Sequence, residues 1–302
     1  MNFLGIDAGG TAVRWVVCDR AGDSVARGEA APVTGHLFLA EARAGFEAFA
    51  GELGAAVADL RIAGVVAGIT GLTGDSAEAA EARGLLSEAL RIDPAAIEVQ
   101  DDLWIGYHAV FKPGQGHVVY AGTGSVGMHI RADGSVLRVG GRGILIDDAG
   151  SAFAIGRAAL NLVYRRIDLG EDPGKLGQAL FAAVGGESWN TMRAHVYGGG
   201  RTAVALLAQV VAEVAEDDPA AMDVLAEAGR ELAVLARALI ARAGARDMVL
   251  LGRAAGLHPA IALAMGAALP GVALRMAMTD AALAAARLAC ERGRPGEGRY
   301  QQ

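Results

Sequence analysis

The sequence is short of cysteine, of aromatic residues and of positive charge. Its two cysteines, Cys18 and Cys290, lack the spacing of a metal site, and we expect both to be small buried core residues. Aromatic residues make up only 5% of the 302 residues, so the core must be built largely from Ala, Val and Leu. A net charge of −7 and the absence of a basic run argue against a nucleic-acid surface.

Long apolar segments are also missing. Asp7 and Arg14 interrupt the amino-terminal apolar run, so no signal-peptide pattern opens the chain. The Ala-rich stretches near the carboxyl end carry Arg, Glu or Asp too often to span a bilayer. We therefore expect a cytoplasmic protein of one large or two ordinary domains, with no membrane partner.

The stretch 118–130 is the most informative part of the chain. Apolar residues run into Gly122-Thr-Gly-Ser125 and out again, which predicts strand, tight turn, strand. Glycines at 122 and 124 remove Cβ where the chain must reverse, and let successive N–H groups face one concave spot. Such a spot binds anions, and the hydroxyls of Thr123 and Ser125 add donors. Because 43 glycines make chance pairs common, an ordinary hairpin turn is the alternative.

The same pattern occurs at the amino terminus. An apolar run, a Gly-Gly-Thr loop at 9–11, a second run, an Asp-containing turn and a third run follow each other there, and the order repeats after residue 118. This internal repeat predicts two similar halves, each offering a phosphate loop to one ligand between them. A third glycine turn, at 251–256, follows the apolar run 248–251.

Strand and helix patterns alternate along the chain, which predicts an α/β fold with mostly parallel sheets and ligands at the carboxyl ends of strands. The turn-rich segment 112–116 is the expected domain boundary, and 170–201 is expected to be irregular because it is rich in glycine. Strands are predicted at 62–69, 97–100, 248–251 and 272–276, and helices at 46–60, 76–90, 103–111, 152–166, 202–216, 219–243, 259–267 and 280–292.

Three motifs resemble those of the actin/hexokinase ATPase superfamily: Gly5-Ile-Asp-Ala-Gly-Gly-Thr11, Ala121-Gly-Thr-Gly-Ser125 and Leu250-Leu-Gly252. Gly140–Ser151 and Tyr197-Gly-Gly-Gly200 resemble the BadF/BadG/BcrA/BcrD group, which includes the N-acetylglucosamine kinases. The resemblance implies two ribonuclease-H-like lobes, 1–115 and 116–302, with a nucleotide cleft between them. It also implies that the last helix, 280–292, returns to pack on the first lobe.

The resemblance implies that Asp7 contacts Mg²⁺, usually through water, although from the residues alone Asp7 could be a turn cap. It assigns Asp102 as the catalytic base that takes the proton from the attacking hydroxyl. Asp101 stays the alternative, because either aspartate could cap the following helix. The residues that would bind ATP are Gly9, Gly10, Thr11, Gly122, Thr123, Gly124, Ser125 and Gly252.

The block 140–151 resembles the sugar-binding block of the family, and it implies that Gly141, Arg142 and Asp148 contact the substrate. Four positions depart from the family pattern: Arg142 replaces Trp, Asp147 replaces Gly, Ala149 replaces Glu, and Val126 stands where Asn is frequent. The planar donor fork of Arg142 suits a carboxylate or phosphate better than the face of a sugar ring. We expect an anionic acceptor if Arg142 faces substrate, and otherwise an ion pair with Asp147 or Asp148.

The resemblance as a whole implies a homodimeric kinase that uses ATP and Mg²⁺ to phosphorylate a sugar hydroxyl, with an amino sugar as acceptor. Two alternatives are a catalytically silent sugar sensor and an ATPase that energises a partner enzyme. The activators of this group carry cysteines around the second phosphate loop, and this sequence has none there.

Overall fold

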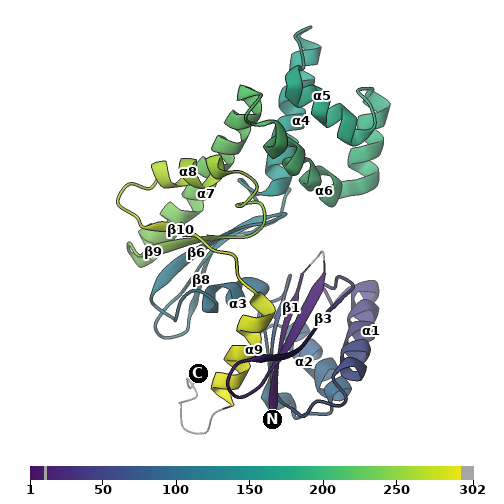
Figure 1. Ribbon diagram of the computed structural model, residues 1–302, viewed down its shortest axis with the longest axis vertical. Coiled ribbons are helices and arrows are strands. Elements are labelled where there is room, and N and C mark those ends of the chain that lie inside the picture. The colour runs from purple at the N-terminus through teal and green to yellow at the C-terminus, as the bar shows by residue number, and fades with distance from the viewer. Residues whose placement is uncertain (10–11, 294–302) are drawn as a thin grey trace. The chain divides into compact units, whose positions relative to one another are not determined.

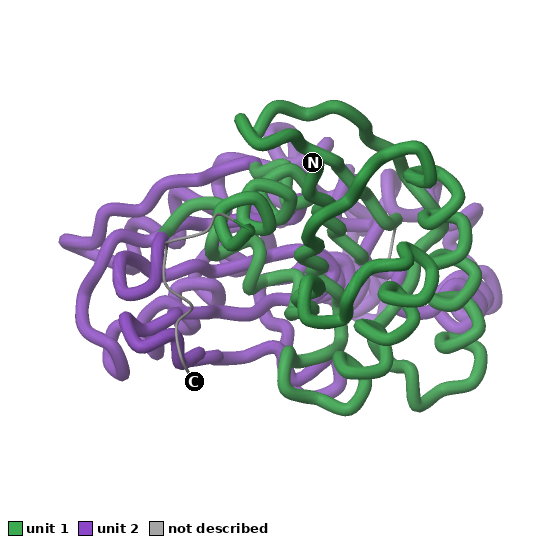
Figure 2. Tube along the Cα trace, turned by 90° about the horizontal axis from the view of Figure 1, so that it is seen from below, with its two compact units in different colours: residues 1–111, 279–302 green, residues 112–278 purple. Residues whose placement is uncertain are grey.

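The structure is a computed structural model that describes residues 1–9 and 12–293 (Figure 1). The chain forms two compact units (Figure 2). Unit 1 holds residues 1–111 together with the segment that begins at Thr279, and unit 2 holds residues 112–278. The last helix, α9 (Ala281–Arg292), therefore belongs to unit 1 although it follows unit 2 in the sequence.

Unit 1 contains a five-stranded sheet in the order β3-β2-β1-β4-β5. Its central strand pairs antiparallel with β2 and parallel with β4, and β4 pairs parallel with β5. The strands are β1 (Asn2–Ala8), β2 (Val13–Cys18), β3 (Ser24–Ala30), β4 (Ile62–Ile69) and β5 (Ile97–Gln100). The other elements are α1 (Ala40–Ala56), α2 (Ala77–Leu90), the short 3₁₀ helix η1 (Pro94–Ala96) and α3 (Asp102–His108).

Unit 2 repeats this topology, with the order β8-β7-β6-β9-β10 read from the corresponding edge. Its strands are β6 (Gly116–Ala121), β7 (Ser125–Ile130), β8 (Val136–Gly140), β9 (Asp247–Leu251) and β10 (Leu274–Met276). The central strand β6 pairs antiparallel with β7 and parallel with β9. At the two edges, β8 pairs antiparallel with β7, and β10 pairs parallel with β9. The internal repeat seen in the sequence and the α/β fold of two ribonuclease-H-like lobes are thus confirmed.

The repeat extends to single hydrogen bonds. In unit 1 the N–H of Thr70, just after β4, donates to the carbonyl of Ala8 at the end of β1, at 2.9 Å. In unit 2 the N–H of Ala254, just after β9, donates to the carbonyl of Ala121 at the end of β6, also at 2.9 Å. Each bond joins the carboxyl ends of two parallel strands, which is the edge where α/β sheets bind ligands.

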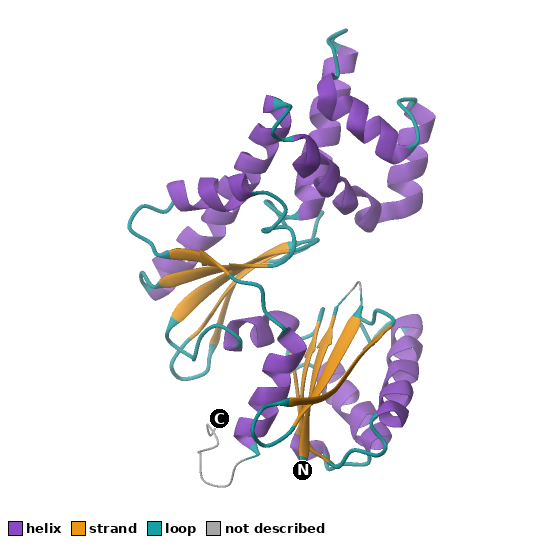
Figure 3. Cartoon of the chain, viewed as in Figure 1, coloured by secondary structure: helices purple, strands orange, loops and turns teal. Residues whose placement is uncertain are grey.

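Helices cover both faces of the unit 1 sheet (Figure 3). Large apolar side chains of α1 and α2, among them Phe46, Leu53 and Leu86, pack with the sheet residues Leu4 and Ile6. On the opposite face, β1 carries Gly5 at its centre. A Cβ on Gly5 would collide with the backbone of α9 at Ala282 and Ala286, so only glycine lets this helix of small residues lie so close to β1.

Unit 2 packs α7 (Pro219–Ala243) against its sheet, and α8 (Pro259–Ala267) against α7. The helices α4 (Ala152–Asp168), α5 (Gly174–Val184) and α6 (Trp189–Val214) pack on one another beside them. The prediction that 170–201 is irregular is wrong, because most of it is helical. Burial of Leu176, Leu180 and Met192 outweighs the low helix propensity of glycine. Within α6, Gly200 alone leaves the helical conformation, with φ 58° and ψ −147°.

Both cysteines are free and buried in unit 1, as the sequence predicted. Burial raises the pKa of the Cys18 thiol to about 11, so this side chain behaves as a small apolar residue. Two histidines of unit 2 are structural as well: His117 and His129 are buried and bond to the backbone carbonyls of Gly244 and Gly116. Within residues 1–9 and 12–293, no helix has the length and apolar character needed to cross a bilayer.

The close approach of α9 to β1 predicts a large cost for any side chain at Gly5. Gly5→Val should lower the free energy of unfolding by about 3 kcal/mol or more, because backbone atoms of α9 cannot move aside cheaply. Gly51→Ala is the matched control. Gly51 lies on α1 with open space around it, so alanine there should raise stability by up to about 1 kcal/mol. Urea unfolding measures both, and equal stability of the two variants would contradict the packing described here.

Candidate functional site

In unit 1, the candidate site lies where β1, β4 and β5 end. Asp7 pairs in register with Gly68 of β4, and Gly68 pairs with Gln100 of β5. The chain then continues from β5 into Asp101 and Asp102. Three parallel strands therefore bring Asp7, Thr70 and the two aspartates to one edge of the sheet.

The Asp102 carboxylate is held by two hydrogen bonds. Its Oδ2 accepts from the Thr70 hydroxyl at 2.5 Å, and its Oδ1 accepts from the N–H of Leu103 at 2.9 Å. Burial raises the pKa of Asp102 to about 7, and the negative charges of Asp101 and Asp7 add to the rise, against the two hydrogen bonds. A carboxyl group that titrates near neutrality is suited to taking up and releasing a proton.

Asp101 occupies the N-cap position of α3 and is 8% exposed. Its Oδ1 accepts from the N–H of Leu103 at 2.9 Å, as the side chain of a helix cap does. The hydroxyl of Thr70 contacts Asp102 and gives the two neighbouring carboxylates different surroundings. This difference could not be read from the sequence, where either aspartate could cap the helix.

The first glycine loop follows Asp7 directly. The N–H of Gly9 donates to the carbonyl of Ala12 at 3.2 Å, which closes the loop between β1 and β2. Gly10 and Thr11, both predicted to bind nucleotide, lie outside the described residues. Asp7 is half-buried at the start of this loop, close enough for its charge to act on Asp102.

In unit 2, the loop Gly122–Ser125 joins β6 to β7. The N–H of Gly122 donates to the carbonyl of Gly124 at 2.9 Å, and the N–H of Ser125 donates to Asp148 Oδ1 at 3.3 Å. The Ser125 hydroxyl donates to the carbonyl of Ala149 at 2.7 Å. Among the described residues, the N–H groups of Thr123 and Gly124 have no hydrogen-bond partner. Two backbone donors and the Thr123 hydroxyl are thus free to bind an anion.

In the loop Gly122–Ser125, close contacts rather than a left-handed backbone favour glycine. Neither Gly122 nor Gly124 has a positive φ. A Cβ on Gly122 would lie 2.8 Å from the Tyr120 ring, and one on Gly124 would lie 2.6 Å from Asp148 Oδ2. Position 252 requires glycine for two reasons: its φ is +99°, and a Cβ there would collide with the Ala121 backbone. The reason expected from the sequence therefore holds for Gly252 and not for the pair in the loop.

The segment 140–151 approaches the same loop from β8. Asp148 adopts a left-handed conformation with φ 65°, which is rare for a residue with a side chain. The residue is 3% exposed, and burial raises the pKa of its carboxyl group, against the Ser125 N–H and the positive charge of Arg201. An Arg201 nitrogen lies 3.8 Å from Asp148 Oδ2. Such a strained and buried carboxylate is typical of a functional position.

Arg142 forms the ion pair that the sequence offered as one alternative. Its guanidinium lies 3.9 Å from Asp147 Oδ2, and its side chain is 65% exposed. A pair this long and this exposed contributes little to stability. Gly141, beside it, has φ +67° and lies against Val126.

Two residues that contact the predicted aspartates, Thr70 and Arg201, were not predicted from the sequence. Thr70 could have been found, because it directly follows a predicted buried strand that ends at the ligand edge of the sheet. Arg201 could not, because it comes more than 50 residues after Asp148, in a segment expected to be irregular.

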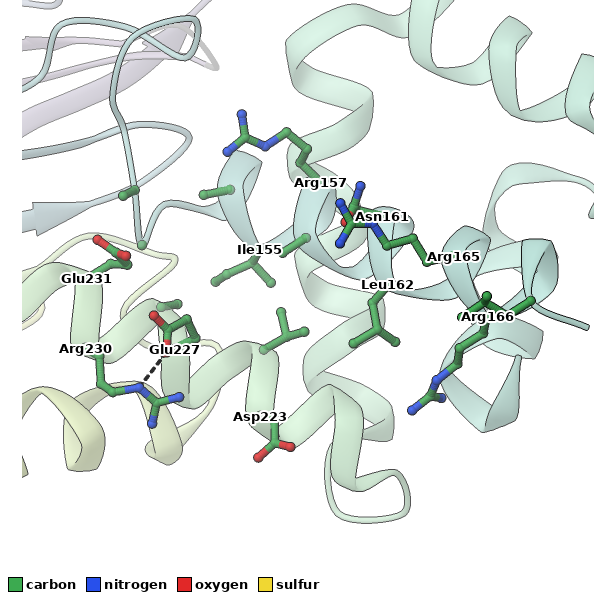
Figure 4. Close-up of a pocket in the computed structure, with 17 residues that line it drawn as sticks. Ile155, Arg157, Asn161, Leu162, Arg165, Arg166, Asp223, Glu227, Arg230 and Glu231 are labelled. Atoms are coloured by element: carbon green, nitrogen blue, oxygen red, sulfur yellow. Dashed lines mark hydrogen bonds and ion pairs between the residues drawn. The ribbon is translucent and has the colours of Figure 1, made fainter. Parts of the chain in front are cut away.

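A groove of about 890 Å³ lies elsewhere, between α4 and α7 (Figure 4). Arg157, Arg165 and Arg166 line it from α4, and Asp223, Glu227 and Glu231 line it from α7. It touches the candidate site only at Ala149 and Gly150. None of the titratable groups with a raised pKa lines this groove, so we place the chemistry at the strand ends rather than here.

The duplicated sheet with glycine loops at its strand ends defines an α/β protein of the actin/hexokinase fold. The sequence matches the BadF/BadG/BcrA/BcrD ATPase family over residues 4–269, and the chain belongs to this family. No curated protein sequence is similar enough to count as a match.

Solved structures share the fold over nearly the whole chain. A protein from Chromobacterium violaceum, proposed to be an N-acetylglucosamine kinase, has a TM-score of 0.75 and 27% identity, over 95% of this chain and 98% of its own. A protein from Porphyromonas gingivalis with the same proposed activity has a TM-score of 0.75 and 18% identity, over 96% and 99%. A ROK family glucokinase from Streptomyces griseus, solved with glucose and AMPPNP, has a TM-score of 0.60 and 16% identity, over 96% and 100%.

The raised pKa of Asp102 predicts a pH-dependent effect on stability. The pKa of about 7 in the folded protein lies above the ordinary value of 3.8, so the fold favours the protonated carboxyl group. That stabilisation is complete below about pH 4 and is lost as the pH rises through 7.

Asp102→Asn mimics the protonated group at every pH. Its stability should match that of the wild type only below about pH 4, and its advantage should be larger at pH 8 than at pH 5 by on the order of 2 kcal/mol. Urea unfolding without nucleotide or Mg²⁺ at the two pH values measures this. A difference that does not change between pH 5 and pH 8 would contradict the raised pKa.

Proposed function

We propose that this protein transfers the γ-phosphoryl group of ATP to a hydroxyl of a sugar, with an amino sugar such as N-acetylglucosamine or glucosamine as acceptor. The observation that carries the proposal is the Asp102 carboxylate at the strand edge, held by Thr70 and titrating near neutrality. Membership of an ATPase family and the likeness to the C. violaceum protein support it.

Asp102 would act as the base for the acceptor hydroxyl. In phosphoryl transfer the base mainly orients the nucleophile, while cations and N–H groups stabilise the charge that develops on the phosphoryl oxygens. The hydroxyl of Thr70 and the N–H of Leu103 fix the direction of the carboxylate. Asp101 is committed to capping α3, which favours Asp102 for this role.

The unpaired N–H groups of Thr123 and Gly124 fit the phosphates of ATP. Gly9, with Gly10 and Thr11 of the first loop, would bind phosphate in the same way, and Ser125 would hold the second loop in shape. Gly252 would lie against the adenosine, where a side chain would collide with Ala121. Together these residues would form the nucleotide site.

Asp7 fits Mg²⁺, because this ion usually keeps several waters and binds proteins through one or two carboxylates together with substrate phosphates. The described residues contain no cluster of three or more metal-ligating side chains, and a nucleotide-bound Mg²⁺ does not need one. The ion, when bound, supplies positive charge to the phosphoryl oxygens. Asp7 would hold it next to the first loop.

Asp148, with Gly141 and Arg142, would bind the sugar. The buried Asp148 carboxylate is an acceptor for sugar hydroxyls, and its fixed left-handed conformation directs it. Among the described residues, Arg142 has only a long, exposed ion pair with Asp147, which leaves its guanidinium available to a substrate.

We also propose that the protein acts as a homodimer in the cytoplasm.

An ATPase that energises a partner enzyme is a weaker alternative. The activators in this family use cysteines near the second phosphate loop, whereas both cysteines of this chain are buried in the core of unit 1. A silent sugar sensor would have no use for a carboxylate whose burial costs stability, so Asp102 also argues against that alternative.

The proposal predicts sugar-dependent turnover. Purified protein with ATP and Mg²⁺ should release ADP above a sugar-free blank when amino sugars are added. Asp102→Asn should lower turnover by a factor of ~10² or more, since it removes the base. Its nucleotide affinity should change little. Release of ADP that no sugar increases, or full turnover by Asp102→Asn, would refute the proposal.

Arg142 predicts the charge of the acceptor. If it faces substrate, the wild type should prefer a sugar acid or a lactyl-bearing amino sugar over plain N-acetylglucosamine. Arg142→Trp should then reverse this preference by ~1.5–3 kcal/mol, about tenfold to a hundredfold. The ratio of kcat/KM for a neutral and an anionic acceptor measures it. Equal losses on both acceptors would show that Arg142 only pairs with Asp147.

A further inference from the structure

Arg201 stands out because the helix that carries it breaks immediately before it. Gly200 is the one residue within α6 that leaves the helical conformation, with φ 58° and ψ −147°, and Arg201 starts the second half of the helix. The second half is anchored by buried residues, among them Val204, Leu207 and Ala208. The break and this anchoring together fix where the Arg201 side chain begins.

The Arg201 side chain ends at the second glycine loop. One guanidinium nitrogen lies 3.8 Å from Asp148 Oδ2 and 3.0 Å from the position that a Cβ on Gly124 would take. In the same loop the N–H groups of Thr123 and Gly124 are without partners among the described residues. A positive charge therefore lies beside two free backbone donors, a combination that binds a phosphate group.

The ion pair with Asp148 leaves most of this guanidinium unused. Arginine has five N–H donors, and the described residues give Arg201 this single contact, too long for a hydrogen bond. The Arg201 side chain is 49% exposed, while that of Asp148 is 5% exposed. The ion pair thus keeps the guanidinium at the loop, while its N–H donors remain available for hydrogen bonds.

We propose that Arg201 is a catalytic residue that binds the phosphoryl group being transferred. This inference rests on the proposed function, because it assumes that Gly122–Ser125 binds the phosphates of ATP. Arg201 pairs with Asp148 in the nucleotide-free protein and contacts the γ-phosphoryl oxygens of bound ATP. A cation supplied in this way stabilises the charge that spreads over those oxygens during transfer.

Nucleotide binding tests the contact without any acceptor. Calorimetric titrations with ADP and with a non-hydrolysable ATP analogue, both with Mg²⁺, compare the wild type with Arg201→Ala. The variant should lose about tenfold to a hundredfold in affinity for the analogue, because it lacks one charge-assisted contact. Its affinity for ADP, which has no γ-phosphate, should fall much less. Arg193→Ala is the matched control: Arg193 lies over the Trp189 ring on the first half of α6, and its loss should change neither affinity.

Turnover supplies a second readout that a structural role would not move. Arg201→Ala should lower kcat by a larger factor than it changes the KM for the acceptor. Added guanidinium ion should restore part of the lost kcat. Arg201→Lys keeps the positive charge but lacks the planar set of guanidinium donors. Its kcat should lie between those of the wild type and Arg201→Ala. Unfolding curves check that each variant folds.

Three results with the variants would overturn this role. Equal losses of affinity for ADP and the analogue would make Arg201 a general electrostatic or structural residue. A rise confined to the KM of the acceptor would place it in the sugar site, and unchanged affinities with unchanged kcat would give it no role. A wild type that binds the analogue but shows no sugar-dependent turnover refutes the proposed acceptor alone, and the affinities still decide the role of Arg201. A wild type that binds neither nucleotide refutes both.

Discussion

One backbone hydrogen bond in each unit determines where the functional groups lie. The bond from Thr70 to Ala8 joins the ends of β4 and β1, and the bond from Ala254 to Ala121 joins the ends of β9 and β6. In unit 1 it sets Thr70 at the strand edge, where its hydroxyl reaches Asp102. In unit 2 it draws the turn after β9 so close to β6 that only glycine fits at position 252.

The second constraint is the burial of carboxylates. Asp102 and Asp148 both have a raised pKa because they lie away from water, and Asp148 also adopts a strained left-handed conformation. Both features cost stability, and proteins retain such costs chiefly where function requires them. Neighbouring groups moderate the cost: Thr70 and Leu103 donate to Asp102, and Ser125 and Arg201 face Asp148. The same groups that stabilise the carboxylates also direct them.

The sequence was sufficient to predict the architecture, because the apolar runs and glycine turns repeat in the same order in both units. The strands 62–69 and 97–100 and the helices 219–243 and 259–267 have the predicted bounds, since Pro, Asp or Gly marks their ends. The segment 170–201 was mispredicted because glycine content hides helices that are stabilised by tertiary packing. The different roles of Asp101 and Asp102, the reason for glycine at 122 and 124, and the position of Arg201 all depend on contacts distant in sequence, which no local pattern contains.

We propose that the family's ATPase chemistry is directed here to a sugar hydroxyl rather than to water. Phosphorus NMR of the wild-type protein with ATP, Mg²⁺ and a mixture of glucosamine and N-acetylglucosamine follows the transferred phosphoryl group directly. We expect a phosphomonoester resonance that grows in proportion to the ADP formed. Formation of ADP with inorganic phosphate alone, at a rate that sugar does not change, would contradict it.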